Sequence, residues 1–352
     1  MIKYLGSKRV LAPVLGDIAD AVGARTALDL FTGTTRVAQE FKRRGLHVTA
    51  SDIATYADVL ARCFVATDST AVDKDGLAAI LADLSALPPR RGYFTETFCE
   101  RSRYLHPDNG ARVDAIRDRI AQEYTAHPLY PVLLTALLLA ADRVDSTTGL
   151  QMAYLKQWAP RALKPLELRV PELLPGPGAS VLGDALALVD ALPPVDLAYL
   201  DPPYNQHRYF TNYHVWETLV RWDHPEHYGV ACKRLDARDE TTKSPFNRRR
   251  EMPAAMESVI RRTRAQVVVV SYNDESWIQP GEIMAWLADS HEDVRMLSFD
   301  AKRYVGAQIG IHNPAGQKVG SVGRLRNVEY LFVAGPAARV EAAVAAAGAA
   351  AG

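Results

Sequence analysis

Hydrophobic and polar positions follow two different periodicities along the chain. Short apolar runs at 26–31, 195–200 and 265–274 predict buried strands, because each is shorter than a buried helix and the last is β-branched at its centre. Small and apolar residues at helical spacing over 10–22, and again over 36–45, predict a helix before and after the first strand. A strand, turn, helix and strand in this order is typical of a parallel sheet.

Four further runs complete the predicted sheet. The segment 46–52 reads as a strand that ends in an acid, and a short strand is expected in SVLGDA at 180–185. Two late strands, at 294–301 and 327–335, fit an antiparallel final pair. The pattern therefore predicts an α/β protein.

The predicted strands frame two irregular blocks. We expect residues 1–54 and 179–335 to form one catalytic domain, interrupted by a mainly helical insertion at 55–178 and by a charged, aromatic insertion at 205–262. Both insertions are expected to carry specificity. The Ala-rich tail at 336–352 is expected to be a frayed helix or disordered.

The composition fits a folded protein and argues against several other classes. Of the 352 residues, 48% are apolar, which is enough for a sizeable core. No window of about 18 uncharged apolar residues occurs, and no apolar signal region opens the chain, so we expect a cytosolic protein. Cys63, Cys99 and Cys232 form no CxxC pair, which predicts buried thiols. His224 and His227 flank a proline and offer no metal site.

Charge is balanced over the whole chain but not along it. The formal net charge is zero, which by itself argues against a nucleic-acid partner. From 233 to 264, however, ten Lys and Arg stand against five Asp and Glu, and the segment 90–110 mixes Arg with aromatic residues. A solvated surface and a surface that binds phosphates and bases both remain open for these segments.

A strand-to-helix turn carries the first candidate chemistry. In DLFTGTT the turn holds Gly33, and Asp52 ends the next strand. Small residues at such a turn let a ligand approach the backbone, and the following acid can accept both ribose hydroxyls. Thr35 stands where a dinucleotide site has a second glycine, so S-adenosylmethionine fits better than a nicotinamide cofactor. Thr35 is free of strain only if its φ is negative, and a turn without any ligand is the alternative.

The tetrapeptide DPPY at 201–204 is the second stretch with candidate chemistry. Pro202 and Pro203 fix two φ angles at the end of a core strand and so aim their carbonyl oxygens, between the acid of Asp201 and the aromatic face of Tyr204. A planar amine can donate one N–H to Asp201 and the other to the Pro202 carbonyl while its ring stacks on Tyr204. Hydrogen bonds that pull both N–H groups out of plane localise the lone pair, which makes the nitrogen nucleophilic toward a methyl sulfonium.

These motifs together resemble one family. KYLGSK near the N-terminus, DLFTGT, DPPY and SYND are similar to the Dam-like, alpha-group DNA adenine-N6 methyltransferases, and DPPYNQHRYFTNYHVWETL is similar to their FokI type. The resemblance implies S-adenosyl-L-methionine as cofactor and a Rossmann-like, mostly parallel seven-stranded methyltransferase sheet with a final antiparallel strand. It also implies direct methyl transfer to an adenine that is flipped out of double-stranded DNA.

The resemblance and the charge pattern assign roles to residues. The expected catalytic residues are Asp201, Pro202, Pro203 and Tyr204. The residues expected to bind the cofactor are Tyr4, Lys8, Asp29, Phe31, Gly33, Asp52, Asp184 and Asp201. The residues expected to contact DNA or the flipped base are Lys8, Asn205, His207, Arg208, Tyr209, Asn212, Tyr213, His214, Arg248, Arg249, Arg250, Tyr272 and Asn273.

Some of these residues have a purely structural alternative. Asp184 fits a helix N-cap, and Tyr272 can pack and hydrogen-bond at a strand end. Tyr4 and Lys8 also fit an ordinary surface N-terminus. For the two prolines between an acid and an aromatic residue, we find no packing role.

The predicted function is site-specific adenine-N6 methylation of DNA in a restriction-modification system. We expect a monomer without a metal, located in the cytoplasm beside the nucleoid, and a companion restriction endonuclease that shares its site without a stable complex. The alternatives are methylation of cytosine N4 or of RNA adenine, and an inactive methylase-derived DNA-binding protein. Asp rather than Ser at position 201, the two long insertions, and the intact Asp52 and Tyr204 argue against these alternatives.

Overall fold

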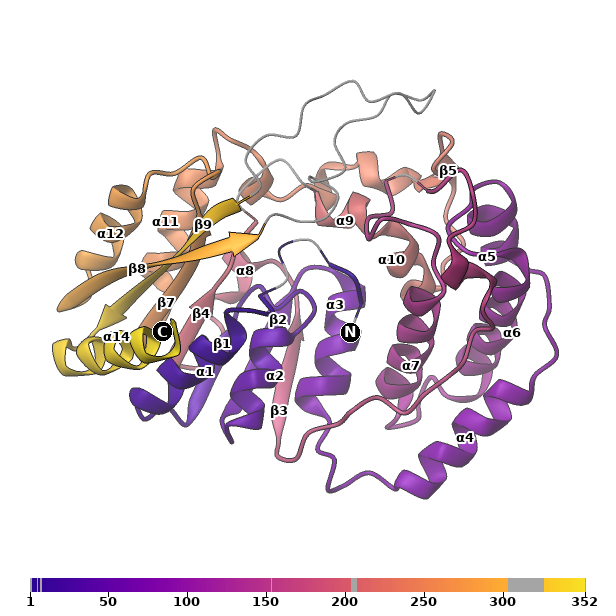
Figure 1. Cartoon of the computed structure of the whole chain (residues 1–352), viewed down its shortest axis with the longest axis horizontal. Helices are drawn as coiled ribbons and strands as arrows, with labels where there is room; N and C mark the ends of the chain where they lie inside the picture. Colours follow the sequence, from indigo (N-terminus) through magenta and orange to yellow (C-terminus); the bar gives the residue numbers. More distant parts are fainter. Residues whose placement is uncertain are drawn as a thin grey trace.

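A seven-stranded sheet forms the centre of one half of the computed structural model (Figure 1). The structure describes residues 2–4, 6, 8–152, 154–203, 208–302 and 326–351. The strand order is β3-β2-β1-β4-β7-β9-β8, and all neighbouring strands are parallel except where β9 pairs with β7 and β8. The strands are β1 (Thr26–Asp29), β2 (His47–Asp52), β3 (Gly178–Leu182), β4 (Val195–Leu200), β7 (Ala265–Asn273), β8 (Asp293–Lys302) and β9 (Arg326–Gly335). The predicted fold class is confirmed.

Helices cover both faces of this sheet, which explains the continuous apolar runs of its central strands. One face is covered by α1 (Ala12–Ala21), α2 (Arg36–Arg43) and α14 (Ala337–Ala351), and the other by α8 (Ala185–Leu188), α11 (Met252–Arg262) and α12 (Pro280–Ala288). Successive side chains of β7 alternate between the two cores: Val267 and Val269 face the first, and Val268 and Val270 face the second.

Two of these helices differ from the sequence-based expectation. Helix α11 lies inside the range of the second insertion, but Met256 and Val259 are buried in the core between α8, α12 and the sheet. Helix α14 lies in the tail that was expected to fray or to be disordered, yet Val340 and Ala343 are fully buried beside α1. Small alanine side chains let α14 approach α1 closely, so a low-complexity sequence forms an ordered helix here.

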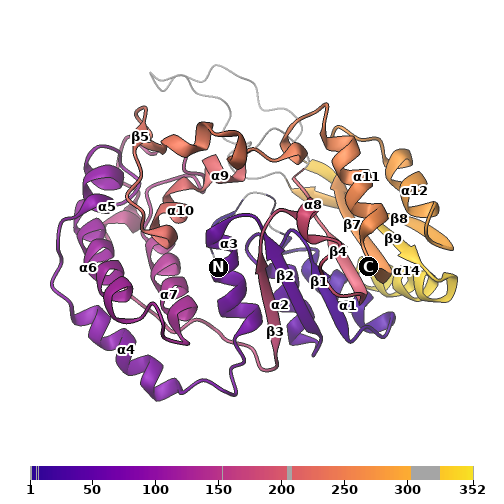
Figure 2. The same ribbon diagram turned by 180° about the vertical axis from the view of Figure 1, so that it is seen from behind.

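A second core lies beside the sheet, within what we call the helical block. It contains α3 (Thr55–Ala61), α4 (Lys74–Ala86), α5 (Tyr93–Thr95), α6 (Pro107–Glu123), α7 (Tyr130–Arg143) and α10 (His214–Arg221). Figure 2 shows from behind that α3 stands between the sheet and the other helices of the block. Helix α10 comes from the second insertion and packs Val215, Trp216 and Leu219 into this core. The first insertion and the α10 region of the second therefore share one core.

The remaining described elements are short. Helix α9 (Tyr209–Asn212) precedes α10, and a small antiparallel hairpin, β5 (His227–Tyr228) with β6 (Lys233–Arg234), follows it. Within the described ranges no helix is long and apolar enough to cross a membrane, and no cluster of metal-ligating side chains occurs. The three cysteines are free and buried, as predicted.

Candidate active site

The turn after β1 brings Gly33 against Tyr4. Gly33 has a φ of +49°, and a Cβ atom there would lie 3.1 Å from the Tyr4 ring, so both conformation and space require glycine. Thr35 has a φ of +63°, so the negative φ that would have kept it free of strain is not present. Its hydroxyl donates to the Thr34 carbonyl at 2.6 Å and accepts from the Gln39 side chain at 2.7 Å, which offsets part of the strain.

Asp52 ends β2 and fixes the two loops beside it. Its Oδ2 atom accepts a hydrogen bond of 2.9 Å from the Gly33 amide, and its Oδ1 atom accepts one of 2.9 Å from the Ala54 amide. Burial raises the pKa of Asp52, and these two amides counteract the rise. A carboxylate held in this way at the end of a strand presents its remaining lone pairs to the cavity that it lines.

Asp29 is the most deeply buried acid of the site. Its side chain is 1% exposed, and the Thr32 hydroxyl donates to its Oδ2 atom at 2.9 Å. Its Oδ1 atom has no hydrogen-bond partner among the described residues. Burial raises the pKa of Asp29 to about 7, and the charges of Asp201 and Asp52 add to the rise. A buried acceptor without a partner is suited to a ligand that donates a hydrogen bond or carries positive charge.

Lys8 connects Asp201, at the end of β4, with Glu329 on β9. Its Nζ atom lies 3.2 Å from Asp201 Oδ1 and 3.2 Å from Glu329 Oε2. The lysine side chain is only 7% exposed, so it is not part of an ordinary surface N-terminus. Burial raises the pKa of Asp201 to about 6, while the Lys8 ammonium acts in the opposite direction.

The predicted catalytic tetrapeptide is described in part. Asp201 and Pro203 line the cavity, and Pro202 is buried beside them. Tyr204, Asn205 and His207 lie outside the described residues. Asp201 follows β4, which pairs with β1 and β7 at the centre of the sheet.

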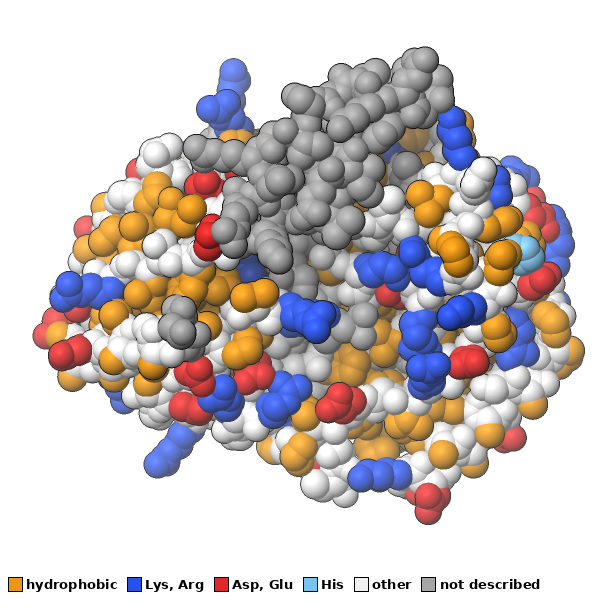
Figure 3. All heavy atoms as spheres, viewed as in Figure 1, with side chains coloured by type: hydrophobic (Ala, Val, Ile, Leu, Met, Phe, Trp, Pro, Cys, Tyr) orange, Lys and Arg blue, Asp and Glu red, His pale blue; other side chains and the backbone are white. Residues whose placement is uncertain are grey.

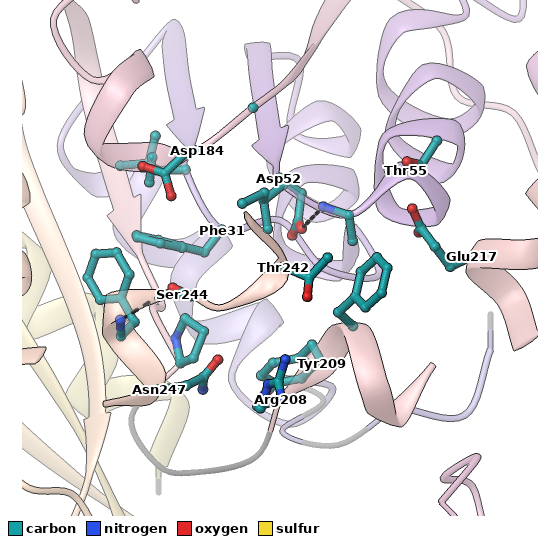
Figure 4. Close-up of a pocket in the computed structure, with 18 of the residues that line it drawn as sticks. Phe31, Asp52, Thr55, Asp184, Arg208, Tyr209, Glu217, Thr242, Ser244 and Asn247 are labelled. Atoms are coloured by element: carbon teal, nitrogen blue, oxygen red, sulfur yellow. Dashed lines mark hydrogen bonds between the residues drawn. The ribbon is translucent and has the colours of Figure 1, made fainter. Parts of the chain in front are cut away.

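One cavity collects side chains from the carboxyl ends of four neighbouring strands (Figure 4). Phe31 follows β1, Asp52 ends β2, Asp184 follows β3 and Asp201 follows β4. This edge of an open parallel sheet is where ligands bind in α/β folds. The opposite wall comes from the N-terminal segment, from α9 and α10 and from the 240–247 segment: Tyr4, Arg208, Tyr209, Phe210, Glu217, Arg221, Thr241, Thr242, Ser244, Phe246 and Asn247.

Asp184 combines the two roles that the sequence left open. Its Oδ1 atom accepts a hydrogen bond of 2.9 Å from the Leu186 amide and so caps α8. The same side chain lines the cavity beside Phe31. The ring of Phe31 meets that of Phe246 edge to face at 5.1 Å, so an aromatic pair stands next to the acid.

Acidic side chains outnumber basic ones around the cavity. Among its described lining residues, Asp52, Asp184, Asp201 and Glu217 are acidic, and Arg208 and Arg221 are basic. Arg221 is itself paired with Asp223 at 3.0 Å. The lining therefore suits a cationic ligand and disfavours a doubly charged pyrophosphate.

Sequence reasoning missed Glu217. This residue is 2% exposed, accepts a hydrogen bond of 3.2 Å from the Tyr56 amide, and faces the cavity from α10 together with Thr55 of α3 (Figure 4). Burial raises its pKa. The only signal was an acid within the predominantly apolar stretch VWETLV, which the DPPY extension contained without giving it a role.

Three residues expected to contact DNA are buried in the helical block instead. Tyr213 is fully buried and stacks on Tyr4 at 4.8 Å. His214 is fully buried with its Nε2 atom 2.9 Å from the Gln151 carbonyl, and burial lowers its pKa to about 3, so it stays neutral. Asn212 is 4% exposed. Their side chains support α9, α10 and the N-terminal segment, because every residue of the run NYHVWE is buried.

The other described residues that were expected to contact DNA fall into three groups. Arg208 and Tyr209 line the cavity, and Tyr209 stacks on Tyr4 at 5.2 Å. Arg249 and Arg250 are exposed, whereas the Arg248 guanidinium pairs with Glu240 and Glu251.

Tyr272 and Asn273 at the end of β7 form the third group. Tyr272 is fully buried, and its hydroxyl accepts from the Ile278 amide at 3.3 Å. Asn273 accepts from the Glu275 amide at 3.1 Å and from the Ser276 hydroxyl at 2.7 Å. Both side chains hold the loop after β7, and neither lines the cavity described above.

Comparisons with known proteins identify the family of the chain. The model of a family described as D12 class N6 adenine-specific DNA methyltransferase matches residues 4–285. The type II methyltransferase M.NlaIII of Neisseria lactamica is 31% identical over 298 residues, which are 80% of this chain and 86% of that protein. M.CviAII of Paramecium bursaria Chlorella virus 1 is 29% identical over 82% of this chain and 88% of its own length. M.FokI of Planomicrobium okeanokoites is 28% identical over 86% of this chain, which spans half of that longer protein.

The family match includes the N-terminal segment, the glycine turn, the tetrapeptide and β7, and it thus covers the strands whose ends form the cavity. The predicted resemblance is confirmed. The chain belongs to the family of D12 class N6 adenine-specific DNA methyltransferases.

Proposed function

We propose that the protein transfers a methyl group from S-adenosylmethionine to the 6-amino group of adenine within one short sequence of duplex DNA. Members of an adenine-N6 methyltransferase family use this methyl donor in general. The observation that carries the proposal is the position of Asp201 and Pro203 at the edge of an acid-lined cavity, at the carboxyl end of the central strand β4.

The described residues fit the cofactor chemically. The molecule carries a sulfonium, an ammonium and one carboxylate group and no phosphate, so it is a net cation, which suits a lining rich in carboxylates and the buried Oδ1 atom of Asp29. We assign Asp52 to the ribose hydroxyls, and Phe31 and Asp184 to the adenine ring of the cofactor. Tyr4 and Gly33 enclose the remainder, with Lys8 and Asp29 beside them.

The chain's own groups prepare the amine. Asp201 accepts one N–H of the target and the Pro202 carbonyl accepts the other, so the nitrogen lone pair turns away from the ring. Bound S-adenosylmethionine would supply an electrophilic methyl group, with its sulfur as the leaving group. Anionic Asp201 stabilises the positive charge that develops on the amine nitrogen. The methylated nitrogen then loses its surplus proton to solvent. Tyr204 remains the predicted stacking partner of the base.

DNA binding requires a phosphate-binding surface near the cavity, because the target base must leave the stack to reach Asp201. Figure 3 shows Lys and Arg side chains gathered over the helical block. The segment 154–169 contributes Lys156, Arg161, Lys164 and Arg169 against the single acid Glu167. We call this segment the basic strap.

The basic strap is linked to the cavity wall through one buried carboxylate. Asp145 pairs with Arg161 at 2.8 Å and with Lys3 at 3.3 Å, and Lys3 directly precedes the cavity residue Tyr4. Arg103 adds a guanidinium 4.4 Å above the ring of Trp158. This arrangement supports the strap, together with Arg249 and Arg250, as the surface for the DNA backbone.

Sequencing of methylated DNA tests the proposal. Genomic DNA from a host that expresses the chain should carry N6-methyladenine in one short sequence, and DNA from a host that expresses Asp201→Asn should not. Methylation only of RNA or of cytosine would overturn the proposal. We further expect a monomer in the cytoplasm beside the nucleoid, with a companion endonuclease that recognises the same sequence without a stable complex.

A further inference from the structure

Glu329 is an acid two residues before the buried apolar half of its strand, Leu331 to Ala334. It lies on β9, the reversed strand of the sheet, where it pairs with Asn273 of β7 and Phe299 of β8. Its side chain is 14% exposed, and its Oε2 atom lies 3.2 Å from Lys8 Nζ. No motif of the sequence pointed to this residue, which is 321 positions away from Lys8.

The two contacts of Lys8 create a shared charge. One ammonium lies 3.2 Å from the carboxylate of Asp201 and 3.2 Å from that of Glu329. With both acids ionised, the three side chains carry a net charge of minus one. Without Glu329, Lys8 would neutralise Asp201 completely. Lys8 would then compete with the target amine for the carboxylate oxygen of Asp201.

We propose that Glu329 is a positioning residue for methyl transfer. It shares the positive charge of Lys8 with Asp201, so that one net negative charge remains beside the reacting amine. This role rests on the proposed function of Asp201 as the acceptor of the amine. The retained charge favours the positive charge that develops on the amine nitrogen, because attraction between charges is strong in a site from which water is excluded. The contact of Lys8 with Asp201 also links the end of β4 to the N-terminal segment.

The groups around Asp201 determine the direction of the pH effect. Lys8 lies on the N-terminal segment, Glu329 on β9, Tyr199 on β4 and Asp29 on β1. Burial raises the pKa of Asp201 most, Lys8 lowers it, and the negative charge of Glu329 raises it. Neutralising Glu329 should therefore lower the pKa of Asp201.

The variant Glu329→Gln tests the role, because glutamine keeps the size of the side chain and can still accept a hydrogen bond from Lys8. In single-turnover methyl transfer to DNA, we expect the maximal rate to fall about tenfold or more, while the acidic limb of the pH profile moves to lower pH. A variant that is merely unstable would not move this limb in that direction. Glu329→Asp, which retains the charge, should restore part of the rate.

The matched control is Glu275→Gln. Glu275 is an exposed acid at the same end of the sheet, where it accepts a hydrogen bond of 2.9 Å from Asn327 of β9. Its neutralisation should leave both the rate and the pH profile unchanged.

A readout without DNA separates this role from the proposed function. Titration of the Asp201 carboxyl by carbon-13 NMR should show a lower pKa in Glu329→Gln than in the parent and in Glu275→Gln. If the pKa of Asp201 is unchanged and the transfer rate stays within twofold of the parent while Asp201→Asn abolishes transfer, the role of Glu329 is wrong and the proposed function stands. If the parent methylates no DNA, the proposed function fails, and an unchanged NMR titration would still overturn the charge coupling.

Discussion

The backbone amide of Gly33 donates a hydrogen bond of 2.9 Å to Asp52, so the glycine turn after β1 and the acid at the end of β2 form one unit. The two motifs are 19 positions apart in sequence. Their contact means that the carboxylate both shapes the turn and lines the cavity. Loss of Asp52 should thus weaken cofactor binding in two ways, by removing a contact to the ligand and by loosening the glycine turn.

We expect Asp52→Ala to weaken S-adenosylmethionine binding by about 10- to 100-fold, because a charge-assisted contact to the ligand and two contacts to backbone amides are lost. Calorimetry measures the affinity. Asp68→Ala is the matched control, since Asp68 also accepts two backbone amides, from Thr70 and Gly176, but lies away from the cavity. Equal affinity of Asp52→Ala and the parent would exclude Asp52 as the ribose acceptor.

Methyl transfer should depend on the ionisation of Asp201. Only the ionised carboxylate stabilises the positive charge that develops on the amine nitrogen, and burial raises the pKa of Asp201 to about 6, so the single-turnover rate should fall as the pH drops through this value. Asp201→Asn should lose about 100- to 1000-fold in rate, with cofactor affinity retained. A rate that is independent of pH across this region would show that another group limits the reaction.

Asp29 should reduce stability at neutral and alkaline pH. Its pKa is about 7 in the folded protein and about 3.9 in an unfolded chain. Because the folded pKa is the higher one, its favourable contribution is present below the unfolded pKa and is lost as the pH rises through about 7. Asp29→Asn should raise the melting temperature more at alkaline than at acidic pH and should weaken cofactor binding. The same gain at every pH would contradict this explanation.

Thr35 should be one of the few positions where glycine is more stable than alanine. Its φ of +63° costs a residue with a Cβ atom about 1–2 kcal/mol, from which the greater freedom of unfolded glycine subtracts up to about 1 kcal/mol. Urea unfolding should therefore find Thr35→Gly about 0.5–1 kcal/mol more stable than Thr35→Ala. The reverse order would mean that the turn relaxes to a negative φ.

The basic strap should contribute to DNA binding through counterion release. Lys156→Ala and Lys164→Ala should each weaken binding to all sequences and reduce the slope of log affinity against log salt by about 0.9. Lys74→Ala, on the exposed start of α4, is the control and should leave the slope unchanged. If the strap variants behave like this control, the DNA backbone follows another surface.

The sequence by itself determined the sheet and the identity of its functional strand ends. Apolar runs of strand length gave the seven strands, and the acids at 29, 52 and 201 could be placed because side chains at the ends of parallel strands share one edge. The tetrapeptide constrained the chemistry, since two prolines between an acid and an aromatic residue have few other uses. These features are local, so a linear pattern is sufficient to recognise them.

Only the tertiary structure decided which distant side chains share a site and which face of a helix is buried. Lys8 and Glu329 meet because β9 inserts in reverse between β7 and β8, a pairing that no local pattern specifies. Tyr213 and His214 look like a polar, DNA-facing run, but both are buried in the helical block, where Tyr213 stacks on Tyr4 and His214 contacts the Gln151 carbonyl through Nε2. The physical reason is that burial and ion pairing depend on neighbours that are distant in sequence and come close only on folding. Hydrophobic periodicity indicates which side of a helix or strand is apolar, but not what packs against it.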